Sequence, residues 1–348
     1  MKVEILKIKK LAKSIFEKAG LSPDDADIIT EVLTETEARG VFTHGFIRLP
    51  RYVDCLLSGG IKKDGTYETL VDTPSWSLLD GKNNLGIVIS YKATSLAIRK
   101  AAETGIGVVN VRHSHHFGAA GYYTSMCADK SMAGFAMSNG DVLLAATGAK
   151  NRSIGNNPFS FAFPANKYGK IVYDIAMSHT SDQKVIKMAK DNLPLPEGWI
   201  IDKNGKPTTD ASEYEKGGTL LPFGGYKGYG MAMMVETLAG ILSGSATTKN
   251  VHAWNTDPNV GGNVGHFFMA LDLSKTGDVN AFRDKTDALI EELKNSPKAE
   301  GVSEIYFPGE IEAAKSALCR QRGWMDIADS TVEAVISSGE KLGLKAGL

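Results

Sequence analysis

The sequence predicts an α/β fold with helices at both ends of the chain. From about residue 75 onwards, segments with apolar residues at helical spacing alternate with short runs rich in β-branched residues, which is typical of a sheet covered by helices. The two ends of the chain instead carry mostly helical spacing. A length of 348 residues usually corresponds to two domains, with a single large α/β domain as the alternative.

Three helices are expected at the start of the chain. Apolar residues at helical spacing predict the first over residues 5–19. Ser22 and Pro23 supply an N-cap hydroxyl and a first-turn proline for a second helix that runs to Arg39. A third helix is expected over residues 46–57.

The central part of the chain alternates between helices and strands. The expected helices span residues 86–103 and 119–130, and the expected strands span residues 106–111, 134–137, 159–163 and 171–176. Residues 193–207 are dense in turn-forming residues, which predicts an irregular surface excursion. The remaining elements are an apolar helix over 229–243, a strand over 264–273 and helices over 279–293, 311–320 and 329–342.

Composition narrows the class of protein. The 39 Lys and Arg residues nearly cancel the 40 Asp and Glu residues, and no basic run interleaves with aromatics, so no nucleic-acid partner is expected. The N-terminus spreads lysines among its apolar residues, unlike a secretory signal, and the longest apolar stretch, 231–242, is too short to span a membrane. The three cysteines form no Cys-x-x-Cys pair. We expect a soluble cytoplasmic protein with a small-molecule partner and no membrane partner.

The segment 113–118 is the strongest functional signal, because it holds three of the seven histidines beside a glycine. Imidazole can ligate a metal, transfer a proton or donate a hydrogen bond. A metal site is disfavoured because Phe117 and Gly118 stand where a dinuclear hydrolase needs further ligands. The segment joins an expected strand to an expected helix, where ligands collect in open α/β sheets. It is therefore predicted to contact a cofactor or transfer a proton; alternatively, His113 and His115 only bond backbone groups.

A second candidate site consists of His44 and Arg48. Residues four apart share one face of a helix, so both side chains can reach one small ligand. An arginine holds a carboxylate through two parallel hydrogen bonds, and a histidine exchanges a proton with a carbonyl or hydroxyl oxygen. The pair predicts a site for a 2-oxo or 2-hydroxy acid, and the alternative is a capping histidine beside a surface arginine.

A glycine-rich segment, 222–230, directly precedes the expected apolar helix. Its glycines, Lys227 and the helix N-terminus can hold a phosphate, although the segment is no Walker loop because no Ser or Thr follows the lysine. A tight turn with packed tyrosines is the alternative. The chain lacks Gly-x-Gly-x-x-Gly, so any dinucleotide must be bound without the Rossmann fingerprint.

Several ordered motifs together resemble one family closely. They are Arg39-Gly40, Thr43-His44-Gly45 with Arg48 and Tyr52, His116 to Tyr123, Gly155 to Pro158, Phe161 to Pro164, Asp174 to Ser178, Gly225 to Gly230 and Pro308-Gly309-Glu310. They look like the malate/L-lactate dehydrogenase family, which is unrelated to the Rossmann-type lactate and malate dehydrogenases. That family also contains ureidoglycolate, sulfolactate and diketogulonate oxidoreductases.

The resemblance implies a fold and an activity. The expected fold is α/β and sulfolactate-dehydrogenase-like, with a non-Rossmann cofactor domain around a mixed sheet over residues 75–224. Residues 1–74 and 225–348 would form a largely helical domain for substrate binding and dimerisation. The implied activity is NAD(P)-dependent, reversible hydride transfer between nicotinamide and a small 2-oxo or 2-hydroxy acid of malate or lactate type. The protein would be a homodimer with sites close to the subunit interface.

The resemblance also implies residue roles. By similarity, His44 or His116 is the acid/base, with the choice between them open, and Arg48 holds the substrate carboxylate. Thr43 stands where members often carry Ser and is counted with the substrate-binding residues. Lys184 matches a lysine common among the dehydrogenases, which favours an oxo acid, and it is counted with the catalytic residues. The matching cofactor positions are His113, His115, Phe117, Ser138, Asn139, Gly140, Asp174, Ile175, Ala176, Tyr226, Lys227, Pro308, Gly309 and Glu310, and no metal ligand is implied.

One departure from the family pattern bears on the cofactor. Asp182 lies in a segment that should border the cofactor, where many members carry Ala-x-Gly-Lys or a close variant. Its charge would repel the extra phosphate of NADP, so NAD is expected and NADP is the alternative. The alternative functions are a ureidoglycolate, sulfolactate or diketogulonate oxidoreductase and, from another class, a His-cluster metal hydrolase.

Overall fold

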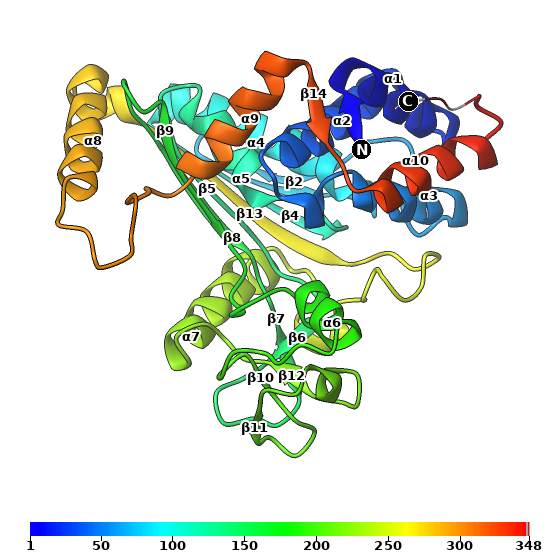
Figure 1. The fold of residues 1–348 in the computed structure, drawn as a ribbon. Helices are drawn as coiled ribbons and strands as arrows, with labels where there is room; N and C mark the ends of the chain where they lie inside the picture. Colours follow the sequence, from blue (N-terminus) through cyan, green and yellow to red (C-terminus); the bar gives the residue numbers. More distant parts are fainter. Residues whose placement is uncertain (346, 348) are drawn as a thin grey trace.

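A mixed seven-stranded sheet forms the centre of the computed structural model, which describes residues 1–345 and 347 (Figure 1). Its strands, in spatial order, are β2 (Glu68–Asp72), β3 (Trp76–Asp80), β4 (Ile106–Ser114), β13 (Val264–Asp272), β5 (Met132–Ser138), β8 (Phe159–Pro164) and β9 (Lys170–Ile175). The pair β3 and β4 is parallel, and every other neighbouring pair is antiparallel.

Two helices cover one stretch of this sheet. Helix α4 (Gly86–Thr104) packs on β4 and β13, and α5 (Ala120–Ala128) packs on β5 and β8. Small residues of α4, such as Ala93 and Ala97, are fully buried against strand residues that include Val109 and Phe268. This close packing fixes the connection between β4 and α5, which holds the histidine-rich segment.

The helices from both ends of the chain form a second core beside the sheet (Figure 1). They are α1 (Ile5–Lys18), α2 (Pro23–Ala38), α3 (Leu49–Ser58) and α10 (Asp329–Lys341), with α9 (Glu310–Arg322) packed against α2. Strands β1 (Lys2–Glu4) and β14 (Trp324–Asp326) pair antiparallel and join the two ends of the chain. Helix α8 (Val279–Lys294) lies apart from this group, beside β8.

A smaller five-stranded sheet forms a separate lobe (Figure 1). Its strands are β6 (Val142–Ala145), β7 (Arg152–Gly155), β10 (Ile200–Ile201), β11 (Pro207–Thr208) and β12 (Thr219–Leu220). Helices α6 (Asp182–Lys190) and α7 (Tyr226–Val235) accompany it, and α7 continues as a π-helical segment, η4 (Glu236–Ile241). Short 3-10 helices complete the fold: η1 (Phe42–His44), η2 (Phe46–Arg48), η3 (Ala211–Tyr214), η5 (Thr248–Asn250) and η6 (Leu273–Lys275).

The predicted α/β fold with a mixed sheet is confirmed, and the differences are local. The third helix begins at Leu49 rather than near residue 46, because residues 42–48 form two 3-10 turns instead. The strands within 193–208 and the exposed strand β2 were not predicted, because two-residue or fully exposed strands carry no alternation of apolar and polar residues. In the described part of the chain, no helix is both long enough and apolar enough to cross a membrane.

Strand β13 departs from the predicted domain division. It belongs to the range 225–348, which was assigned to the helical domain, yet it pairs with β4 on one side and β5 on the other. The sequence predicted the strand itself, but no local pattern shows which strands it pairs with, and the pairing decides the sheet to which it belongs. The division at residues 74 and 224 otherwise stays a prediction.

Candidate active site

A cavity of about 760 Å³ lies where the terminal helices, the carboxyl ends of β4, β5 and β9, and the smaller lobe come together. Its wall is built from α2, the turn before α3, the connection from β4 to α5, and the segments around residues 138–141, 172–176, 252–255 and 306–312. These segments are far apart in the sequence, so the cavity is a product of the whole fold.

The side chain of Glu37 holds the turn that carries His44 and Arg48 in place. This buried carboxylate accepts a hydrogen bond from the Phe46 backbone N–H at 2.9 Å, and a Cβ at Gly45 would collide with it. Arg48 Nε donates to the Thr43 carbonyl oxygen at 2.6 Å. Both functional side chains line the cavity, and the terminal nitrogens of Arg48 remain available to a ligand.

The His116 ring is held on several sides. Its Nδ1 lies 2.5 Å from the hydroxyl of Tyr52. The Trp254 ring stacks on it at 4.4 Å between centroids, and the His44 ring stacks at 5.6 Å. The Arg48 guanidinium lies 5.6 Å from the centroid of the Trp254 ring. We call His44, Arg48, Tyr52, His116 and Trp254 the imidazole cluster.

Burial keeps both histidines of this cluster neutral. It lowers the pKa of His44 to about 4, with the nearby Arg48 charge as a second cause. It also lowers the pKa of His116 well below the ordinary value, assisted by His44 and Arg48. Near pH 7 the cluster therefore combines one permanent cation with two uncharged imidazoles, a set that can hold an anion and exchange a proton.

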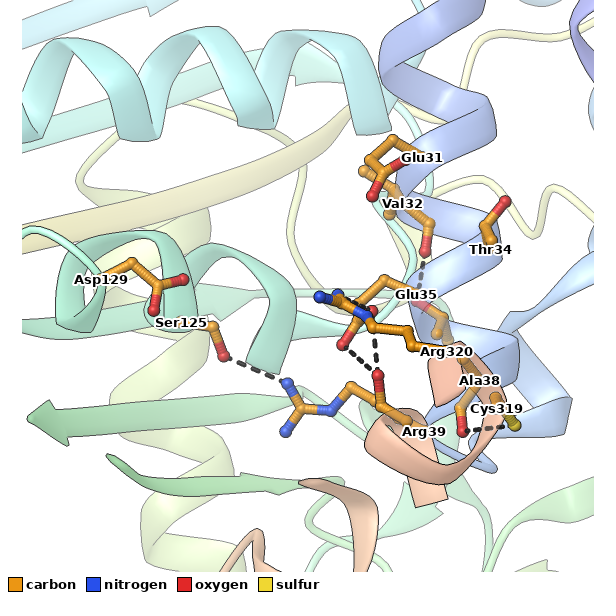
Figure 2. A network of polar contacts seen from close by, with 12 residues as sticks. Glu31, Val32, Thr34, Glu35, Ala38, Arg39, Ser125, Asp129, Cys319 and Arg320 are labelled. Carbon is orange, nitrogen blue, oxygen red and sulfur yellow. Dashed lines mark hydrogen bonds and ion pairs between the residues drawn. The ribbon is translucent and has the colours of Figure 1, made fainter. Parts of the chain in front are cut away.

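A different set of polar contacts ties α2 to its neighbours elsewhere on the cavity wall. Arg39, which follows α2 directly, donates to the Ser125 hydroxyl of α5 at 3.2 Å, and Arg320 of α9 donates to the Glu35 carboxylate of α2 at 2.6 Å (Figure 2). The Ser316 hydroxyl also donates to Glu35, at 3.1 Å. We call Glu35, Arg39, Ser125, Ser316 and Arg320 the α2–α9 cluster. Glu35 and Arg39 line the same cavity as the imidazole cluster.

Asp174, at the end of β9, also lines the cavity. Its carboxylate accepts a hydrogen bond from the Gly121 N–H at 2.7 Å, at the start of α5. Desolvation of the carboxyl group raises the pKa of Asp174 to about 6, while the hydrogen bond from the Gly121 N–H and the positive charge of Arg39 lower it. An acceptor of this kind suits hydroxyl groups of a ligand.

Most of the residues predicted from the sequence meet at this one cavity. They are Thr43, His44, Arg48, His116, Phe117, Ser138, Asn139, Gly140, Asp174, Ile175, Ala176, Pro308 and Gly309. The motif with His44 and Arg48 and the motif with His116 lie some seventy residues apart in the sequence and are neighbours in space.

The other predicted site residues lie outside the cavity wall. His113 bonds the Asp80 carboxylate at 2.9 Å, rather than a backbone group, and the His115 ring is fully buried with no partner for either nitrogen among the described residues. The remainder point elsewhere: Lys184 lies over the Trp199 ring, Tyr226 and Lys227 are exposed on α7, and Glu310 bonds Lys294 and the Phe307 N–H. Their roles stay predictions.

The sequence analysis missed two members of the imidazole cluster. Tyr52 was noted only as part of a motif, because it lies in α3 while His44 and Arg48 lie in the two 3-10 turns before that helix, so no helical spacing links the three side chains. Trp254 lies in an irregular segment, and its contact with His116 depends on the path of the chain after η5. No local pattern marks it.

The metal alternative finds no centre in the described part of the chain. Among residues 1–345 and 347, no group of three histidine, cysteine, aspartate or glutamate side chains is arranged to hold a metal ion. Of the three clustered histidines, His113 bonds the Asp80 carboxylate and His116 lies against the Tyr52 hydroxyl, whereas His115 has no hydrogen-bonding partner among the described residues.

Comparison with known proteins agrees with the geometry. The model of the malate/L-lactate dehydrogenase family matches residues 3–336. The chain belongs to the malate/L-lactate dehydrogenase family. Its relatives include a malate dehydrogenase from Pyrococcus horikoshii, 39% identical over 303 residues, which cover 85% of this chain and 83% of the relative. The NAD(+)-dependent ureidoglycolate dehydrogenase of Escherichia coli K12 is 28% identical over 97% of this chain and 95% of its own.

Solved structures confirm the fold of this family member. The sulfolactate dehydrogenase from Methanocaldococcus jannaschii superposes with a TM-score of 0.92 at 33% identity, over 99% of this chain and 98% of that one. The malate dehydrogenase from Pyrococcus horikoshii gives a TM-score of 0.91 at 34% identity, over 100% and 97%. The family resemblance predicted from the motifs is thereby confirmed.

Proposed function

We propose that the protein is an NAD-dependent dehydrogenase that interconverts a small 2-oxo acid and the corresponding 2-hydroxy acid, of malate or lactate type. The observation that carries this proposal is the convergence of Arg48, His44 and His116 on one cavity wall. The same cavity is lined by residues 138–140 and 174–176, which the motif resemblance predicts to contact the cofactor. Substrate and cofactor would thus meet in one place.

The described residues fit an extended dinucleotide. The cavity volume of about 760 Å³ falls in the range of roughly 300–1,000 Å³ that is usual for ligand sites. Gly140 lies open on its wall, because a Cβ there would meet only Asn156 Oδ1, at 4.0 Å. A ligand can therefore approach the Gly140 backbone, and Asp174 offers a carboxylate to ribose hydroxyls.

The residues of the imidazole cluster supply what the cofactor does not. A bound nicotinamide carries the hydride chemistry. Arg48 holds the substrate carboxylate through its terminal nitrogens, because its Nε is already bonded to Thr43. In the reduction direction, the imidazole of His44 or His116 would take up a second proton as the anionic substrate binds, give its Nε2 proton to the carbonyl oxygen and return to the neutral ring, and oxidation reverses this transfer. Fixed placement of the reacting groups lowers the entropic part of the barrier.

The preference for NAD rests on Asp182. This acid begins α6 and lines the cavity, where its charge would repel the additional phosphate of NADP. A relative whose name specifies NAD(+) supports the same choice. A higher catalytic efficiency with NADPH than with NADH would contradict it.

We also propose that the protein is a cytoplasmic homodimer. Apolar side chains are exposed along α7 and η4, among them Tyr226 at 70% and Ile241 at 63% exposure, with Met233, Met234 and Leu242 beside them. Several exposed apolar side chains within one helical segment are typical of a subunit interface. Light scattering should give twice the mass of one chain, and Ile241→Glu should shift the protein to monomers. A monomeric wild type would contradict the dimer.

The substrate test uses five oxo acids with NADH and with NADPH: oxaloacetate, pyruvate, sulfopyruvate, diketogulonate and oxalurate. We expect oxidation of NADH with oxaloacetate or pyruvate. Preference for one of the other three would identify a sulfolactate, diketogulonate or ureidoglycolate oxidoreductase. Failure of all five with both cofactors would refute the proposed function.

A further inference from the structure

Tyr52 contacts the His116 ring. The position of the proton in this contact determines which ring nitrogen of His116 carries a proton toward the cavity. Tyr52 lies in α3, is fully buried and is not part of the cavity wall. Its hydroxyl lies 2.5 Å from Nδ1 of His116, and this nitrogen is its only hydrogen-bonding partner among the described residues. Nε2 is the other nitrogen of the His116 ring. Because Nδ1 is turned toward Tyr52, Nε2 faces the cavity.

The direction of this hydrogen bond follows from the partners available. Burial raises the pKa of Tyr52 far above its ordinary value, so the phenol keeps its proton. A buried O–H needs an acceptor, and the only one within reach in the described chain is the lone pair of His116 Nδ1. Since burial also keeps His116 neutral, its single ring proton must be on Nε2.

We propose that Tyr52 is a positioning residue that fixes His116 in the tautomer with the proton on Nε2. His116 then presents a hydrogen-bond donor to the cavity, matched to the carbonyl oxygen of an oxo acid, which can only accept. Stacking on Trp254 at 4.4 Å, with an interplanar angle of 13°, keeps the ring plane in place, so the donor has a defined direction. The assignment of a substrate oxygen to this donor rests on the proposed function, whereas the tautomer itself does not.

The hydroxyl of Tyr52 can be removed with little change of shape. In Tyr52→Phe the ring still fills its place against Trp254, where the two rings lie 5.2 Å apart. The matched control is Tyr123→Phe, because Tyr123 is equally buried and its hydroxyl bonds the Phe117 carbonyl oxygen instead of a histidine. Both variants lose one buried hydroxyl, and only Tyr52→Phe loses the contact with His116.

The deciding measurement is ¹⁵N NMR of the His116 ring in the protein without substrate. Wild type and Tyr123→Phe should show Nε2 protonated and Nδ1 unprotonated, whereas Tyr52→Phe should show a mixture of tautomers. A wild-type ring protonated on Nδ1, or a pattern that Tyr52→Phe leaves unchanged, would overturn the proposal. A confirmed tautomer in a protein that reduces none of the five oxo acids would refute the proposed function alone.

Kinetics give a second readout. In Tyr52→Phe we expect kcat for oxo-acid reduction to fall about tenfold, as for the loss of one hydrogen bond, with KM changed less than about twofold. The pKa of the His116 limb in the pH profile should rise, because the lost bond favoured the neutral ring. A purely structural role would lower activity without moving this limb, and that result would also contradict the proposal.

Discussion

The imidazole cluster and the α2–α9 cluster each contribute residues to the wall of the same cavity but are built in opposite ways. In the imidazole cluster, aromatic rings stack at 4.4 to 5.6 Å between centroids, and Arg48 is the one permanent charge. In the α2–α9 cluster, charges of both signs are paired, as in the 2.6 Å contact between Arg320 and Glu35. The first arrangement keeps proton-exchanging groups neutral and oriented, and the second fastens helices that form the wall. Function and rigidity are therefore assigned to different regions.

The largest effect should come from removing an imidazole. In His116→Gln we expect kcat/KM for oxo-acid reduction to fall about 10³-fold, within the range usual for loss of a positioned acid/base. In His44→Gln the fall in kcat/KM should be smaller, because the His44 ring lacks the contact with Tyr52. His179→Gln is the control, since His179 is exposed and lies outside the cavity wall. Steady-state kinetics with a stable, folded variant provide the measurement, and turnover of His116→Gln within threefold of wild type would contradict this role.

The next largest effect should come from Arg48. Replacement by Met removes the only permanent cation of the imidazole cluster and should lower kcat/KM about 10²-fold, mainly through a higher KM for the oxo acid. Arg48→Lys should recover part of the loss as a point charge without the second hydrogen bond. Arg99→Met, on the exposed side of α4, serves as the matched control. Equal kinetics for Arg48→Met and Arg99→Met would exclude Arg48 from the site.

The free energy of unfolding should depend on pH because of His115, which lies near the imidazole cluster. His115 is fully buried beside Trp254, and burial lowers its pKa to about 3 from 6.5. Because the unfolded chain binds this proton more readily, the free energy of unfolding should fall as the pH drops from about 6.5 toward about 3, by about 2–3 kcal/mol at pH 4.5. His115→Phe should reduce that slope in denaturant titrations across this range. An unchanged slope would show that His115 does not titrate as a buried neutral group.

The smallest effect should come from the α2–α9 cluster. Arg320 is 67% exposed on its side chain, so Arg320→Met should lower the free energy of unfolding by less than about 1 kcal/mol, with kcat nearly unchanged. The difference from wild type should shrink at high salt, because exposed charges are screened. Loss of most of the activity in Arg320→Met would break the contrast between the two clusters.

Prediction from sequence worked where the signal is local. The bounds of α4, α5 and β13 follow from periodicity and end residues. His44 and Arg48 line one cavity as predicted, although two 3-10 turns bring them together and not the helix face that the prediction assumed. The stacking of Trp254 on His116 and the placement of β13 between β4 and β5 were beyond reach. Both depend on contacts between segments distant in sequence, which tertiary packing alone determines. His113, His115 and His116 lie within four residues, yet each has a different environment, which the sequence alone did not predict.

The most direct test of the central claim follows the hydride itself. The protein is incubated with each of the five oxo acids and NADH deuterated at the transferred position of nicotinamide C4, and the product is analysed by mass spectrometry and NMR. The account predicts a 2-hydroxy acid that carries deuterium on its C2 atom, with the label lost from the cofactor. Retention of the label on the cofactor with all five acids would contradict it.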